Sequence, residues 1–140
     1  MTLNPQIVGQ AENAHGAIMD LVLAGTSLNR DRWVALSLVT FAGGAVASDT
    51  LTARMSGALK IASGTARDAV TELKAAGLLT ADGGEVTITE QGQAMVATVR
   101  GTTGPILARA YADVPAEDLA TAARVLVAIT AGLNRELATL

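Results

Sequence analysis

The sequence lacks cysteine, and its 140 residues include only one histidine, one tryptophan, one tyrosine and one phenylalanine. The absence of cysteine excludes a disulfide framework, a thiolate zinc site, an iron–sulfur cluster and a cysteine nucleophile. Because aromatic residues make up only 2% of the chain, Ala, Leu, Val and Ile must fill the core. We therefore expect a protein of the reducing cytoplasm that packs mainly through helices.

Charge is also sparse, with 10 basic and 13 acidic side chains and a net charge of −3. A chain with this balance does not attract nucleic acid as a whole, so any such role depends on a local patch. The longest uncharged run, 33–48, is interrupted by polar and glycine residues, and the N-terminus has no basic run before an apolar stretch. We expect neither a membrane span nor a signal peptide.

Half of the residues are apolar and the mean hydropathy is +0.39, which excludes a disordered chain. A length of 140 residues is that of one domain with a core of its own. The sequence has no internal repeat, low-complexity segment or linker, so we predict a single domain spanning 1–140.

Helices with narrow apolar seams are predicted at both ends of the chain. Asn4 and Pro5 are typical of a helix start, and apolar residues then recur at spacings of three and four until about Gly25. The last helix is predicted from about Pro115, and its apolar positions alternate spacings of three and four: Leu119, Ala122, Leu126, Ile129 and Leu133. Such seams are typical of helices that pack along other helices.

Two further helices are predicted to be long or central. One begins with Asn29 as its cap, is apolar on more than one face and stops at Gly43, so it should be buried. The other runs from Glu90 to about Tyr111, where Gly101, Gly104 and Pro105 are expected to bend or weaken it.

Two short helices and a hairpin are predicted between 48 and 89. The first helix carries on one side Leu51, Met55, Ala58 and Leu59. The second has Ser63 as its cap, ends at Gly77 and carries on one side Ala66, Ala69, Val70 and Leu73. Runs rich in β-formers flank a turn at 81–85, which predicts a small hairpin.

This order of elements is that of a winged helix-turn-helix with helical extensions. The chain resembles the multiple antibiotic resistance regulator (MarR) family over nearly its full length, in segments 28–36, 51–55, 66–79 and 88–92. The resemblance implies a mostly α fold with a small β-hairpin, a winged helix-turn-helix lobe at 29–100, and dimerisation helices at 1–25 and 101–140. It also implies a homodimeric, ligand-responsive repressor that binds a pseudo-palindromic operator on double-stranded DNA.

The helix at 63–76 would present a polar face opposite its apolar side. Short hydroxyls and an arginine at the front of a helix suit entry into the major groove, because Arg bonds guanine bidentately and Ser or Thr bond phosphates or base edges. Cations on the preceding helix and turn suit phosphate contacts. The candidate DNA-binding residues are therefore Arg54, Lys60, Ser63, Thr65, Arg67, Thr71 and Lys74. On an isolated helix the same pattern is typical of a solvated face.

One departure from the family concerns the predicted wing, which is short and acidic, with Asp82 and Glu85, where relatives commonly carry Arg or Lys. Carboxylates near the phosphate backbone repel it. This feature favours the alternative of a small-molecule-binding protein or enzyme on a MarR-like scaffold that has lost DNA binding. A protein-interaction module is a second alternative.

The family geometry also implies a pocket for a small aromatic or anionic ligand, bordered by the first, second and fifth helices. The candidates for it are His15, Met19, Trp33, Phe41, Arg109 and Tyr111. A tryptophan in an apolar helix is more often a core anchor, and a lone histidine on a seam helix is more often a dimer contact. No catalytic motif, paired histidines or phosphate-binding loop is present, so we predict no enzyme activity, metal or cofactor.

Overall fold

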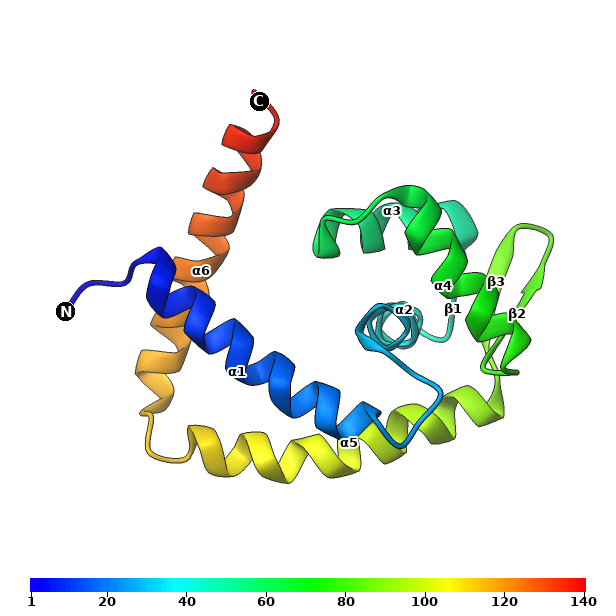
Figure 1. The fold of residues 1–140 in the computed structure, drawn as a ribbon, viewed down its shortest axis with the longest axis horizontal. Coiled ribbons are helices and arrows are strands. Elements are labelled where there is room, and N and C mark those ends of the chain that lie inside the picture. The colour runs from blue at the N-terminus through cyan, green and yellow to red at the C-terminus, as the bar shows by residue number, and fades with distance from the viewer. The chain divides into compact units, whose positions relative to one another are not determined.

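The computed structural model describes all 140 residues as nine elements (Figure 1). In chain order they are α1 (Pro5–Leu23), α2 (Arg30–Phe41), β1 (Ala45–Ala47), α3 (Ser48–Leu59), α4 (Ser63–Ala75), β2 (Leu79–Asp82), β3 (Glu85–Ile88), α5 (Glu90–Tyr111) and α6 (Ala116–Leu137). The chain divides into two compact units, Met1–Gly104 and Pro105–Leu140. None of the helices has the length and apolar character that crossing a membrane requires.

Side-chain caps set the starts of the first two helices, as the sequence predicts. The Asn4 Oδ1 accepts a hydrogen bond from the Ile7 backbone N–H at 3.0 Å, and the Asn29 Oδ1 accepts one from the Arg32 N–H at 2.9 Å. The predicted Ser63 cap is wrong: Ala62 holds the extended capping conformation, and Ser63 is already helical. The first turn of α4 therefore has no side-chain cap.

The β-structure is larger than the predicted hairpin. Three antiparallel strands lie in the order β1-β3-β2, and β1 was missed because it has only three residues after a glycine turn. The hairpin itself is confirmed, with Leu79 opposite Ile88 and Asp82 opposite Glu85. Its loop is Gly83-Gly84 alone, and both glycines have positive φ, which matches the twist of a two-residue hairpin.

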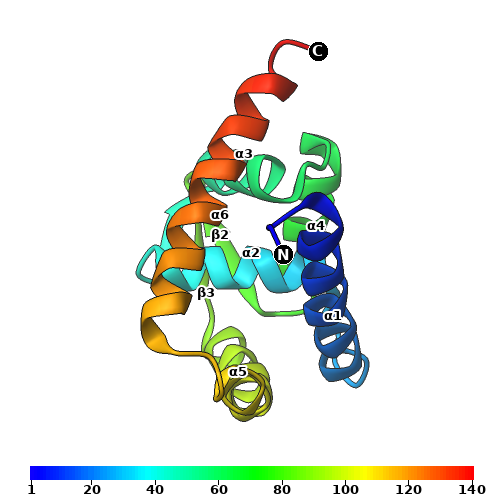
Figure 2. The same ribbon diagram turned by 90° about the vertical axis from the view of Figure 1, so that its left-hand side faces the viewer.

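The core of the first unit surrounds α2, as expected for a helix that is apolar on more than one face. Ala35, Leu36 and Val39 are fully buried. Figure 1 shows α2 end-on beneath α3, and Figure 2 shows it along its length with α3 again above it. On α3, Leu51 and Met55 are buried, whereas Ala58 is exposed, contrary to the prediction that it faces the core.

The second unit contains the end of α5, coloured yellow in Figure 1, and all of α6, coloured orange to red. α5 continues through Pro105 as one helix, and the chain divides into its two units at this same point. No residue of α6 is buried. Its predicted apolar seam is largely exposed, with Leu126 at 41%, Ile129 at 40% and Leu133 at 64%.

Candidate nucleic-acid interface

The two sides of α4 divide as the 3.6-residue period of a helix requires. Its four predicted core residues are all buried, at 0% to 5% exposure: Ala66, Ala69, Val70 and Leu73. The helix ends at Ala75, and Gly77 follows with a φ of +77° that allows the Leu78 N–H to bond the Leu73 carbonyl at 3.0 Å. α4 is thus fixed to the core on one side and open to solvent on the other.

All seven predicted DNA-binding residues are exposed. Five lie on α4 itself: Ser63, Thr65, Arg67, Thr71 and Lys74. Arg54 lies on α3, and Lys60 is the C-terminal cap of α3, where its Nζ donates to the Gly57 carbonyl at 2.7 Å. The two ion pairs of the structure use Arg30 and Arg32, so Arg54, Arg67 and Lys74 are not neutralised by a salt bridge within the chain.

The front of α4 is suited to an anion. Arg67 folds back toward the start of the helix, where its Nη2 lies 3.9 Å from the position that a Cβ on Gly64 would take. The first N–H groups of a helix carry partial positive charge, and here no side chain caps them. An arginine and uncapped amides together are features that phosphate oxygens recognise.

Acidic side chains oppose this charge. In the segment 48–88 the basic residues are Arg54, Lys60, Arg67 and Lys74, and the acidic residues are Asp49, Asp68, Glu72, Asp82 and Glu85. The carboxylates of Asp82 and Glu85 are exposed directly opposite each other beside the hairpin turn. The Ser48 N–H donates to the Gly84 carbonyl at 2.8 Å, which fixes this acidic tip against the start of α3.

One of these acids is neutralised by a residue that sequence reasoning missed. Arg32 of α2 donates from Nε to the Glu72 carboxylate at 2.7 Å and forms an ion pair with it through Nη2. Its Nη1 donates to the Ser27 carbonyl at 2.8 Å. Because the paired residues are 40 positions apart, no local spacing in the sequence indicates this contact.

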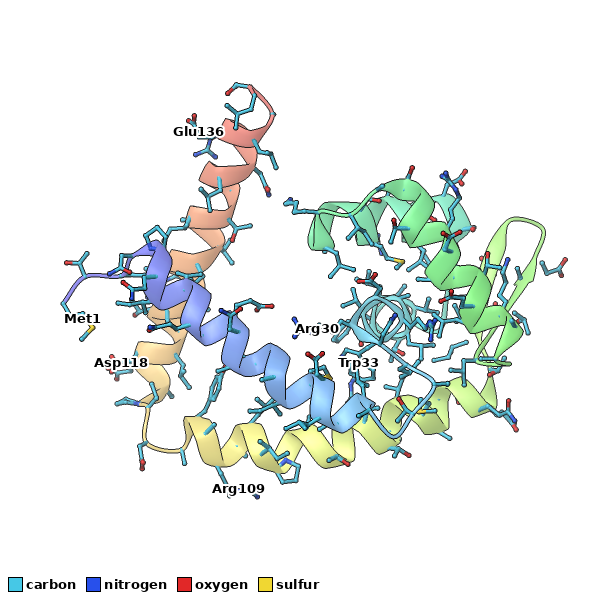
Figure 3. All side chains as sticks on the ribbon, viewed as in Figure 1. Met1, Arg30, Trp33, Arg109, Asp118 and Glu136 are labelled. Atoms are coloured by element: carbon cyan, nitrogen blue, oxygen red, sulfur yellow. The ribbon has the colours of Figure 1, made fainter.

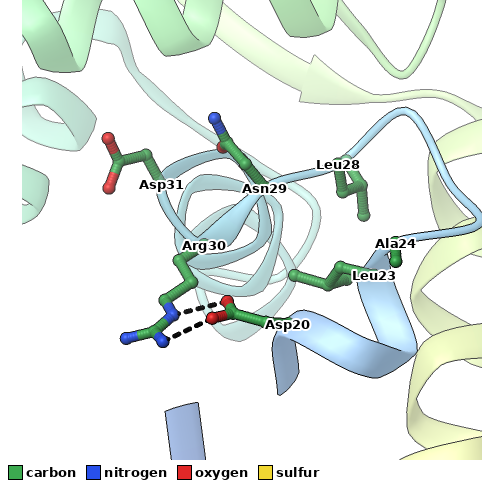
Figure 4. Close-up of a pocket in the computed structure, with 7 residues that line it drawn as sticks. All are labelled: Asp20, Leu23, Ala24, Leu28, Asn29, Arg30 and Asp31. Atoms are coloured by element: carbon green, nitrogen blue, oxygen red, sulfur yellow. Dashed lines mark hydrogen bonds and ion pairs between the residues drawn. The ribbon is translucent and has the colours of Figure 1, made fainter. Parts of the chain in front are cut away.

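A second arginine ties α1 to α2. Arg30 binds Asp20 through two parallel hydrogen bonds of 2.7 Å, drawn as dashed lines in Figure 4. These bonds hold the pKa of Asp20 below its ordinary value, since the neighbouring guanidinium stabilises the carboxylate, and they raise the pKa of Arg30. A Cβ on Gly16 would lie 2.6 Å from the guanidinium, so glycine lets Arg30 lie against α1.

The hollows on the first unit include the following three. The one in Figure 4, about 360 Å³, lies beside the Arg30–Asp20 pair and is lined by Leu23 and Leu28. A second, about 340 Å³, is lined by Thr40, Gly43, Gly44, Ile88, Gln93 and Val96. A third, about 510 Å³, lies between the 25–27 loop, the end of α4 and α5.

The six candidate ligand residues line none of these hollows. His15 is exposed, and its Nδ1 lies 2.8 Å from the Ala11 carbonyl. Met19 and Trp33, the latter labelled in Figure 3, pack half-buried against the core. Phe41 is 77% exposed, with the Arg100 guanidinium 5.1 Å from its ring centroid. The remaining two, Arg109 and Tyr111, are exposed in the second unit.

No family model and no curated protein matches the chain by sequence. Solved structures do match it. A MarR family transcriptional regulator from Silicibacter pomeroyi is 20% identical, with 94% of this chain and 89% of that chain covered and a TM-score of 0.77. The chain has the MarR fold. MarR from E. coli in its reduced form matches at 12% identity, over 92% of this chain and 94% of that one, with a TM-score of 0.69.

BpsR from Bordetella bronchiseptica also matches, at 20% identity and a TM-score of 0.70, over 91% of this chain and 93% of that one. The DNA binding of BpsR is regulated by 6-hydroxynicotinic acid. The fold predicted from the residues of the present chain is thus confirmed. Within the MarR fold, α3 and α4 form the helix-turn-helix, and β2 and β3 form the wing.

Proposed function

We propose that this chain is a DNA-binding transcriptional regulator of the MarR type and that α4 is its recognition helix. The observation that carries the proposal is the outer face of α4. Its cations Arg67 and Lys74 take part in no intramolecular salt bridge, and hydroxyls lie beside them on a helix whose other side is buried. Bidentate arginine contacts and hydroxyl contacts are those by which helices read the major groove.

The active form is a homodimer. The support is the exposed apolar seam of α6, since leucine and isoleucine at spacings of three and four match a second copy of the same seam. A two-fold dimer presents two α4 helices to two half-sites about 34 Å apart on the duplex. A pseudo-palindromic operator follows from this symmetry.

DNA binding responds to a small aromatic or anionic ligand. The support is the resemblance to ligand-responsive regulators of this fold. The few ring side chains of the sequence, His15, Trp33, Phe41 and Tyr111, are the candidates for stacking against such a ligand. A ligand that changes the spacing of the two recognition helices weakens or strengthens operator binding by its differential affinity for the two states. Equal operator affinity with and without ligand contradicts this part.

Fluorescence anisotropy tests the proposal directly. Purified protein is titrated against a duplex that covers the DNA upstream of its own gene, and against a scrambled duplex, at two salt concentrations. We expect tighter binding to the first duplex and an affinity that falls as salt rises, because phosphate contacts release counterions. In Arg67→Ala, affinity for the first duplex should fall by about tenfold or more, since a lost bidentate base contact costs about 1 to 3 kcal/mol.

A second function is favoured by one observation, the exposed carboxylates of Asp82 and Glu85 at the wing tip. In that case the protein binds a small molecule on a MarR scaffold without binding DNA. The anisotropy titration distinguishes the two functions. Binding that is absent at low salt, in protein shown by circular dichroism to be folded, supports the ligand-binding protein and overturns the regulator.

A further inference from the structure

We propose that Arg32 is a positioning residue that holds the recognition helix in the orientation required to discriminate the operator from other DNA. We call the contact set of Ser27, Arg32 and Glu72 the Arg32 strap. It joins three segments, namely the loop before α2, the first turn of α2, and α4. The inference rests on the proposed function.

Hydrogen bonds hold both the backbone and the side chain of Arg32. The Arg32 backbone N–H is held by the Asn29 cap at 2.9 Å, so the start of its side chain is fixed on α2. The guanidinium then divides its donors between the Glu72 carboxylate and the Ser27 carbonyl. A planar guanidinium bonds two acceptors in a fixed geometry, whereas a lysine ammonium lacks this geometry.

The position of Glu72 on α4 explains why its contact with Arg32 affects DNA recognition. Glu72 follows Thr71, a predicted DNA contact, and precedes Leu73, which is fully buried. Its side chain is 53% exposed and still reaches Arg32 of α2, so Glu72 lies at the border between the outer face and the core face of the helix. A contact at this border opposes rotation of α4 about its own axis, which is the motion that would displace the side chains of Arg67 and Thr71.

The Arg32 strap adds a directional contact to the apolar contacts that α4 makes with the core. Two of its four buried residues are alanines, Ala66 and Ala69, which offer one methyl group each to the core. Apolar burial is non-directional, while charge-assisted hydrogen bonds are short and directional. The Arg32 side chain is 28% exposed and the Glu72 side chain is 53% exposed, so only the arginine end of the pair is partly shielded from solvent.

The test compares Arg32→Lys with the matched control Arg30→Lys. Both variants keep the net charge and lie in the same turn of α2, but the partner of Arg30 is Asp20 on α1 rather than a residue of α4. The measured quantity is the ratio of two affinities: the affinity for the duplex that covers the DNA upstream of the gene, and the affinity for the scrambled duplex. We expect Arg32→Lys to lower this ratio by about fivefold, and Arg30→Lys to leave it unchanged.

Two more variants separate positioning from charge. Glu72→Gln removes a negative charge beside DNA, so a purely electrostatic role predicts tighter binding and an unchanged ratio, whereas positioning predicts a lower ratio. In the exchanged pair, Arg32→Glu with Glu72→Arg, the ion pair is restored and the ratio should recover in part. An unchanged ratio in both Arg32→Lys and Glu72→Gln overturns the inference.

Amide hydrogen exchange in the absence of DNA tests whether Arg32 holds α4, and this test does not depend on whether the protein binds DNA. The strap predicts faster exchange along α4 in Arg32→Lys than in wild type and Arg30→Lys, because local opening becomes easier. If wild type does not discriminate between duplexes, the proposed function fails and so does the DNA-reading part of this inference. Unchanged exchange in α4 overturns the claim that Arg32 holds the helix.

Discussion

The helices α4 and α6 both carry a regular apolar side, but this side is buried in α4 and exposed in α6. α4 buries four of its 13 residues in the core of the first unit, whereas α6 buries none of its 22. Each apolar side is visible in the sequence through the same spacings of three and four. The spacing therefore predicts an apolar side that another surface can cover, and it does not tell whether that surface lies in the same chain.

The two helices also differ in what their apolar sides do. Since α4 completes a core within its own unit, its buried residues determine the stability of the lobe. The exposed leucines of α6 contribute little to the isolated chain and gain stabilisation when another surface covers them, at roughly 25 cal/mol per Å² of apolar area. If α6 pairs with a second copy, its seam controls assembly and, through assembly, DNA binding.

The largest expected effect comes from breaking the α6 seam with Leu126→Asp and Leu133→Asp together. Carboxylates at two seam positions cannot be buried between helices without a large desolvation cost. We expect a monomer by analytical ultracentrifugation. Operator affinity should fall by about 100-fold or more, because the second half-site no longer binds as part of the same molecule.

The control for this variant is Ala131→Asp, which lies on the opposite side of α6 at 100° per residue and is likewise exposed. It should remain dimeric and bind the operator as wild type does. A dimer that survives both seam substitutions contradicts the assignment of α6 to the homodimer.

The next largest effect is expected in α4, on the free energy of unfolding. There Leu73→Ala truncates a fully buried side chain. We expect a loss of about 2 to 5 kcal/mol in the free energy of unfolding, from lost transfer energy and the cavity left behind. Urea denaturation at a fixed protein concentration measures it. The exposed neighbour Thr71→Ala should change the free energy by about 0.5 kcal/mol or less. Equal losses in both variants would contradict the division of α4 into a core face and an outer face.

The parts of the fold that depend on local signals were predictable from the sequence. Asn29 begins its helix because its side chain bonds a nearby N–H, and Gly77 follows the end of another because glycine adopts the required positive φ without a steric penalty. The buried and exposed faces of α4 follow from periodicity. The seven candidate DNA-binding residues are exposed as expected, and their contacts with DNA stay a prediction.

Features set by tertiary contacts were not predictable. The strand β1 has three residues, too few for an alternating pattern, and it exists because β3 pairs with it. The Arg32–Glu72 pair joins residues 40 apart, and the approach of Arg30 to Gly16 depends on the α1–α2 turn. Ala58 was expected in the core and is exposed, since one-sided periodicity does not tell how wide the buried face of a helix is.

A smaller effect is expected at the wing, where Asp82→Asn with Glu85→Gln removes two carboxylates. We expect operator affinity to rise by about threefold to tenfold at low salt and by less at high salt, because screening weakens the repulsion that the substitutions remove. The control, Asp113→Asn with Glu136→Gln, changes the net charge equally in the second unit. If it raises affinity as much as the wing variant, the effect belongs to net charge, and the wing tip does not approach DNA.

The smallest effect is expected for Asp20→Asn, which breaks the exposed ion pair between α1 and α2. The pKa of Asp20 lies below its ordinary value of 3.8, so the pair contributes stability above about pH 3.8, and this contribution is lost as pH falls through the lowered pKa. In thermal unfolding, Asp20→Asn should be slightly less stable than wild type at pH 7 and equal to it in strong acid. A difference that persists in strong acid, where Asp20 is protonated, would show that its side chain stabilises the protein by a contact other than the ion pair.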